Sequence, residues 1–149
     1  YILNKTFDNC DLLTDINLSN NKIINIPTNI KPSKHIRKLN LSNNNINIDV
    51  EHFILKHYNN LETLDISHNK IININEDTFN DFTNLRYLYL NDNKISEIPE
   101  NLFDSCEKLE ILDLSNNCFT EVPRIISDMK NCVYCQKNTS YPERMRLFS

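Results

Sequence analysis

Residues 85–98 read LRYLYLNDNKISEI, and this stretch decides how the rest of the chain is interpreted. It follows the pattern L-x-x-L-x-L-x-x-N, with an apolar residue two places after the asparagine and a second one three places later. The same pattern, with isoleucine replacing leucine at some positions, occurs four more times at spacings of 23 to 25 residues, starting at Leu13, Ile36, Leu61 and Leu109. Five copies in phase indicate a repeat protein, in which each copy is one structural unit.

The alternation L-x-L and the frequent isoleucines predict a short strand in each repeat. An amphipathic helix would need apolar residues about 3.6 positions apart, which this pattern does not provide. One such unit cannot bury its apolar side alone, so successive units must stack on each other. We therefore expect the framework leucines and isoleucines to share one core, with Phe79 and Phe103 filling its convex side.

Asparagine ends each copy of the pattern, at Asn21, Asn44, Asn69, Asn93 and Asn117. These five are expected to form an inward-facing ladder that satisfies backbone groups of the tight turns. A buried amide without such partners would cost roughly 1–3 kcal/mol. The preceding residues Asn20, Asn43 and Asn116 are expected to tolerate a positive φ, which asparagine adopts more readily than most residues.

The pattern resembles the leucine-rich repeat family over nearly the whole chain. This resemblance implies an α/β solenoid, with a curved parallel sheet on the concave face and short helical or irregular segments on the convex side. Repeats of 24 residues with a convex phenylalanine look most like those of extracellular and receptor domains, such as Toll-like receptors and matrix proteoglycans.

The function implied by the resemblance is recognition of a protein partner through the concave face. An enzyme is not expected, because the sequence offers no nucleophile with a matching base and orienting group. The resemblance slightly favours an extracellular or cell-surface location over a cytoplasmic one. The alternative is an intracellular adaptor or targeting subunit of a ligase or phosphatase assembly.

The repeat domain is expected to cover residues 1–135, with a half repeat at 1–12 and five repeats starting at 13, 36, 61, 85 and 109. Because the chain starts halfway through a repeat, we expect it to be a fragment of a longer array. Residues 52–58 are expected to form a longer return segment on the convex side. Residues 136–149 show little periodicity and are expected to be a polar tail or the remnant of a cap.

Composition excludes several function classes. The 149 residues contain no glycine, so glycine-rich phosphate loops and dinucleotide-binding turns are excluded. The formal net charge of −4, without a basic stripe, argues against nucleic acid as a partner. No apolar run is long enough for a membrane span. The four histidines have no spacing typical of catalysis, and no cofactor or metal site is expected.

Five cysteines leave at least one thiol unpaired within the chain. Cys118, Cys132 and Cys135 are candidates for a structural disulfide or cap. Free thiols or a metal site remain alternatives, although a single C-x-x-C provides only two of the four ligands that zinc needs. Cys10 and Cys106 align with Phe82 and are expected to be small buried residues.

The predicted binding face consists of strand residues that alternate with the core positions. Tyr87 and Tyr89 stand out, because solvent-facing positions need only be polar and exposed aromatics are typical of interfaces. The alternative is that tyrosine occurs there for its β propensity alone. Asp65 and Asp113 flank the tyrosines and suggest a partner surface with lysine or arginine. The full candidate set is Lys38, Asn40, Thr63, Asp65, Arg86, Tyr87, Tyr89, Asn91, Ile111 and Asp113.

Overall fold

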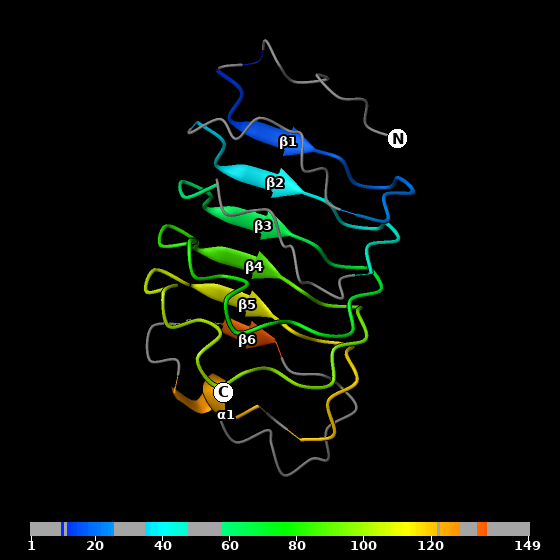
Figure 1. Cartoon of the computed structure of the whole chain (residues 1–149), viewed down its shortest axis with the longest axis vertical. Helices are drawn as coiled ribbons and strands as arrows, with labels where there is room; N and C mark the ends of the chain where they lie inside the picture. Colours follow the sequence, from blue (N-terminus) through cyan, green and yellow to red (C-terminus); the bar gives the residue numbers. More distant parts are fainter. Residues whose placement is uncertain are drawn as a thin grey trace.

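The computed structural model describes residues 10, 12–25, 35–47, 58–121, 123–128 and 134–136, with backbone alone for 127–128 and 134–136. Each repeat contributes one three-residue strand, and the strands form a single parallel sheet in sequence order (Figure 1). They are β1 (Asp15–Asn17), β2 (Lys38–Asn40), β3 (Thr63–Asp65), β4 (Tyr87–Tyr89), β5 (Ile111–Asp113) and β6 (Tyr134–Gln136). The short helix α1 (Arg124–Asp128) lies between β5 and β6. The expected α/β solenoid is confirmed.

The core lies between the sheet and the return segments. Strands pair in register, so that the central residues form one row in which each is at most 5% exposed, namely Ile16, Leu39, Leu64, Leu88 and Leu112. Phe79 closes the convex side, with its ring centroid 5.6 Å from that of Phe103 and 5.8 Å from that of Phe82. All three rings are buried, which confirms the expected convex position of Phe79 and Phe103.

The asparagine ladder links each repeat to the one before it. The Asn69 side-chain amide donates to the carbonyls of Ile66 and Ser67 in its own repeat and of Leu41 in the preceding repeat, at 3.0–3.1 Å. Its Oδ1 accepts the N–H of Ile46 at 2.9 Å. One side chain therefore satisfies four backbone groups in two turns.

Ladder residues at the two ends are less buried than those in the middle. Asn44 and Asn93 repeat the Asn69 geometry and are buried. Asn117 is half-buried, and Asn21 is exposed. Asn21 donates to the carbonyls of Leu18 and Ser19, as Asn69 does to those of Ile66 and Ser67, so it faces its own turn as expected but is exposed. No described turn stacks outside it.

Strand β6 extends the sheet beyond the five repeats found in the sequence. Cys135 pairs in register with Leu112, and Gln136 pairs with Asp113. The predicted boundary at residue 135 therefore falls inside a strand. The repeat pattern does not predict this strand, because Cys135 occupies the position where the pattern requires leucine or isoleucine.

Several predictions concern residues outside the described part of the chain. Most of the half repeat 1–12 falls there, together with most of the return segment 52–58 and the tail from residue 137. Cys10 is described and is exposed, so its expected burial is wrong. It belongs to the first turn, against which no described repeat packs from outside.

We predict that Asn69→Ala lowers the free energy of unfolding by about 3 kcal/mol or more, because it leaves buried backbone groups of two repeats unsatisfied. Asn21→Ala changes the same ladder position where it is exposed, and we expect a loss below about 1 kcal/mol. Urea unfolding followed by circular dichroism measures both. Equal losses would contradict a ladder that acts by satisfying buried groups.

Candidate functional site

The concave face carries the residues on either side of each central core residue. In β4 the side chain of Leu88 is buried, whereas Tyr87 and Tyr89 are half-buried on the opposite side of the strand. Their neighbours in register are Thr63 and Ile111 beside Tyr87, and Asp65 and Asp113 beside Tyr89. The structure thus brings six of the predicted residues together on three adjacent strands.

The other predicted residues lie around this group of six. Lys38 and Asn40 belong to β2, which β3 separates from β4. The Lys38 Nζ lies 3.8 Å from the Asp15 carboxylate on β1. Arg86 directly precedes β4, and Asn91 lies two positions after its last residue, Tyr89.

A local hydrogen bond, which we call the strand-exit lock, ends four of the five repeat strands. An Asn or Asp Oδ1 at the last strand position accepts the N–H of the serine two residues later, at 2.9–3.0 Å. In three repeats the serine hydroxyl donates to the same oxygen at 2.6–2.7 Å. The four pairs are Asn17–Ser19, Asn40–Ser42, Asp65–Ser67 and Asp113–Ser115. This side-chain-to-backbone bond stabilises the turn that follows the strand.

The lock changes the interpretation of three predicted binding residues. Asn40, Asp65 and Asp113 were selected as surface polar groups, but the fold already uses one oxygen of each. Asp113 is only 9% exposed. Sequence analysis could have found the lock, because the N-L-S, D-I-S and D-L-S triplets recur at the same place in four repeats.

Strand β4 departs from the lock. Tyr89 occupies the position of the locking Asn or Asp, and Asn91 occupies the position of the serine. The Asn91 amide donates instead to Asp92 Oδ2 at 2.7 Å. The fourth repeat thus has an aromatic ring where its neighbours have a bond that supports the turn.

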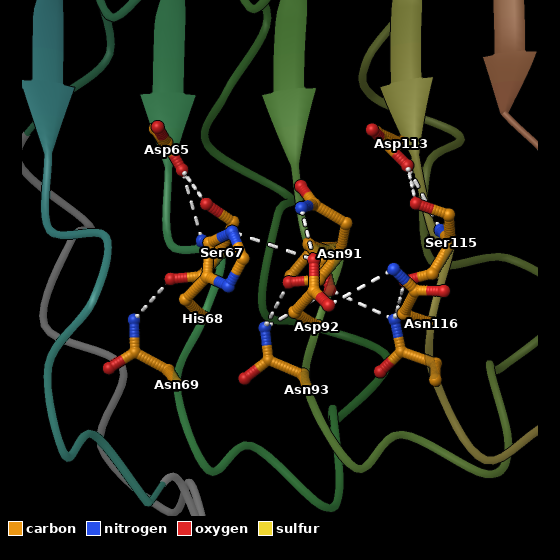
Figure 2. A network of polar contacts seen from close by, with 12 residues as sticks. Asp65, Ser67, His68, Asn69, Asn91, Asp92, Asn93, Asp113, Ser115 and Asn116 are labelled. Carbon is orange, nitrogen blue, oxygen red and sulfur yellow. Dashed lines mark hydrogen bonds and ion pairs between the residues drawn. The ribbon is translucent and has the colours of Figure 1, made fainter.

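One residue in each repeat has a positive φ, between 51° and 58°, and these residues form a second ladder at the strand exits. The expectation for Asn20, Asn43 and Asn116 is confirmed, whereas His68 and Asp92 were not expected there. Asp92 connects three repeats, because its carboxylate accepts from the Asn116 amide at 3.0 Å and lies 3.5 Å from His68 Nε2 (Figure 2). Aligning the repeats would have identified His68 and Asp92 by position.

Arg86, Tyr87 and Glu110 form a polar cluster at the entry of β4. The Arg86 Nε donates to Glu110 Oε1 at 2.7 Å, and the Tyr87 hydroxyl donates to Glu110 Oε2 at 3.0 Å. The Arg86 guanidinium also lies over the Tyr87 ring, 5.3 Å from its centroid. Arg86 and Tyr87, both predicted to contact a partner, are therefore already engaged with each other and with Glu110.

The cluster shifts the acidity of its members. The hydrogen bond from Arg86, followed by the one from Tyr87, lowers the pKa of Glu110 from its ordinary value of 4.5. The hydrogen bond to Glu110 raises the pKa of Tyr87 above 10.0, because only the neutral phenol can donate. The stabilisation involving Glu110 is present above pH about 4.5 and is lost as the pH falls through its lower folded-state pKa.

We predict that Arg86→Gln raises the pKa of Glu110 towards its ordinary value, because it removes the cation and the strongest donor. Carbon-13 NMR titration of the glutamate carboxyl groups measures this shift. Arg37→Gln is the matched control, because Arg37 forms the corresponding ion pair with Glu62 at 2.6 Å on the preceding strands. An unchanged Glu110 titration in Arg86→Gln would contradict the cluster geometry.

The cysteines differ in accessibility. Cys106 is buried as expected, and burial raises the pKa of its thiol to about 12. Cys118 is exposed and free. Cys132 lies outside the described residues, and only the backbone of Cys135 is described, so the cap or disulfide stays a prediction.

We predict that iodoacetamide at pH 8 alkylates Cys118 in the folded protein but not Cys106, because a buried thiol forms little thiolate. Peptide mass spectrometry after brief labelling measures the modified fraction of each. In urea both cysteines should react, which controls for intrinsic reactivity. Equal labelling of the folded protein would contradict the burial of Cys106.

The described residues lack two features. Within those ranges no group of three or more His, Cys, Asp or Glu side chains could hold a metal ion. A helix that could span a membrane is likewise absent from these residues.

Comparison with known families supports the repeat assignment. Residues 34–95, 59–119 and 83–132 match the family described as "Leucine rich repeat". Residues 1–57 match the "BspA type Leucine rich repeat region (6 copies)". No curated protein sequence matches the chain.

Solved structures with a similar fold include two internalins of Listeria monocytogenes. An internalin C2 superimposes with a TM-score of 0.73 at 20% identity, over 92% of this chain and 57% of its own. A second internalin superimposes with a TM-score of 0.69 at 22% identity, over 91% of this chain and 37% of its own. The chain thus spans about half the length of these proteins or less, and the likeness is one of fold.

Proposed function

The chain belongs to the leucine-rich repeat family, and from that premise we propose that it recognises a protein partner through its concave face. The proposed contact surface is centred on Tyr87 and Tyr89 in β4. Thr63, Asp65, Ile111 and Asp113 on the adjacent strands surround them. Lys38, Asn40, Arg86 and Asn91 form its periphery.

The main support for this proposal is that β4 lacks the strand-exit lock that the other four repeat strands have. Four repeats use the last strand position for a bond that supports their own turn. Tyr89 provides no such bond and lies outside the core, so folding alone does not explain its presence. Tyrosine is enriched among the residues that contribute most to protein–protein affinity.

The physical basis of binding is a preformed surface. The ladders and the locks hold the strands before a partner arrives, so binding orders few additional groups. The Tyr87 ring is further restrained by the hydroxyl bond to Glu110 and by the Arg86 guanidinium. A few restrained aromatic side chains can then anchor a partner.

A second candidate function is the intracellular adaptor. In the described part of the chain Cys10, Cys106 and Cys118 form no disulfide, and free thiols are typical of reducing compartments. Both candidates use the same concave face, and they differ in the compartment that supplies the partner. Capture from separate cell lysate and secreted fractions distinguishes them.

We predict that Tyr89→Asn with Asn91→Ser abolishes capture of the partner while the fold is retained. The double change introduces the Asn-x-Ser lock of the first two repeats, so we expect a stability within about 1 kcal/mol of the parent. The immobilised parent and variant are exposed to both fractions, and captured proteins are compared by mass spectrometry. Asp104→Asn with Glu107→Gln, at exposed convex positions, is the control and should capture normally.

A photo-cross-linking residue tests the same face directly. Placed at Thr63, beside Tyr87 in the sheet, it should cross-link the captured protein. Placed at Asn101, on an exposed convex turn, it should not. Cross-linking from Asn101 alone, or capture that survives the double change at Tyr89 and Asn91, would overturn the proposed function.

A further inference from the structure

Tyr89 lies between two carboxylates. The register of the sheet places Asp65 of β3 on one side of it and Asp113 of β5 on the other. Adjacent strands are about 4.8 Å apart, so the backbones of both aspartates directly flank that of Tyr89. An aromatic ring with neighbouring negative charge attracts a cation through both its π face and the carboxylates.

The strand-exit lock orients the carboxylates of Asp65 and Asp113 through one oxygen of each. The second oxygen takes no part in the lock. Oδ1 of Asp113 accepts both the N–H and the hydroxyl of Ser115, and Oδ1 of Asp65 does the same with Ser67. In the described part of the chain, no hydrogen bond or ion pair reaches Oδ2 of either residue. Figure 2 shows the second oxygen of Asp113 turned away from Ser115 and towards β4.

Of the two aspartates that flank Tyr89, Asp113 is the stronger candidate for binding a cation. The residue is about nine-tenths buried, and its second carboxylate oxygen has no partner in the described residues but keeps access to solvent, because among them only Thr78 Oγ1 is a buried side-chain polar atom without a partner. A carboxylate oxygen that is reachable from solvent and held next to a largely buried backbone can accept from a cation with little competing hydration. A second group nearby is also unused, because the Tyr89 hydroxyl has no hydrogen bond within the described ranges.

Among the described residues, no charged side chain forms an ion pair with Asp113. Arg86 is held by Glu110 at the opposite end of the strand. Lys38 lies on β2 near Asp15, with β3 and β4 between it and Asp113. His68 is next to Asp92 in the ladder that follows the strands.

We propose that Tyr89 and Asp113, with Asp65 as a second carboxylate, bind an arginine side chain of the partner. The planar guanidinium stacks on the Tyr89 ring and donates to Oδ2 of Asp113, a combination that lysine cannot provide with one ammonium group. This inference rests on the proposed function, because it names the chemistry that the concave face recognises. Asp65 contributes through its charge, which attracts the guanidinium at longer range.

Short peptides test this preference without the natural partner. The probes are acetyl-Gly-Arg-Gly-amide and the same peptide with citrulline, which keeps the shape of arginine without its charge. Titration of the nitrogen-15-labelled protein at low salt should give saturable shifts at the amides of Ser67, Tyr89 and Ser115 with arginine, in the millimolar range. Citrulline should bind about tenfold more weakly or not at all, and the lysine peptide should bind more weakly than arginine.

Asparagine variants provide matched controls within the chain. Asn17 and Asn40 hold the same lock as the two aspartates, so Asp113→Asn and Asp65→Asn remove a charge while keeping the turn. We expect Asp113→Asn to weaken the arginine peptide about tenfold and Asp65→Asn about twofold. Tyr89→Leu should weaken it about threefold through loss of the ring face.

The possible outcomes separate the two proposals. Equal affinity for arginine and citrulline, or an unchanged affinity in Asp113→Asn, overturns the arginine site. If the arginine site fails in this way but the variant with Tyr89→Asn and Asn91→Ser still loses capture of the protein partner, the proposed function stands and only the arginine site is rejected. Selective arginine binding combined with capture that persists in that variant supports the site and overturns the proposed function.

Discussion

The rest of the structure depends on the side-chain amide of the ninth repeat position. Asn69 satisfies four backbone groups and bonds across the boundary between two turns. This geometry sets the distance and register of consecutive strands, because only a stack of equal turns lets each amide reach the carbonyl of the turn before it. The ordered concave face follows from that constraint, since residues 23 to 25 positions apart become neighbours.

The strand-exit position shows how the fold and the binding face share residues. The aspartates of β3 and β5 support their turns with one oxygen and leave the other without a partner in the described chain. Tyr89 lies between them on β4 and cannot form the strand-exit lock, because its side chain has no carboxylate or amide oxygen. A stacked array tolerates this exception, because the backbone bond from Asp92 N–H to the Ser115 carbonyl, at 3.0 Å, still ties the fourth turn to the fifth. One repeat can thus be specialised while its neighbours maintain the geometry.

Much of this arrangement could be predicted from the sequence, because the repeat is strict. The strands, the core rows and the inward-facing asparagines of the central repeats all follow from residue type and spacing. The sixth strand did not, since cysteine occupies the framework position at Cys135. The positive φ of His68 and Asp92 was also missed, because it comes from the repeat geometry and not from the preference of these residue types.

The sequence by itself determined the repeat, its period and which residues alternate between core and surface, because these depend on local spacing. Only the tertiary structure decided which surface groups are still available to bind. The Tyr87 hydroxyl donates to Glu110, whereas one oxygen of Asp113 has no partner in the described part of the chain. Such pairings depend on atoms that are distant in the chain and meet only once the strands are in register. The sequence can therefore identify the concave binding face, whereas the packing of the repeats decides which polar groups on that face can bind a partner.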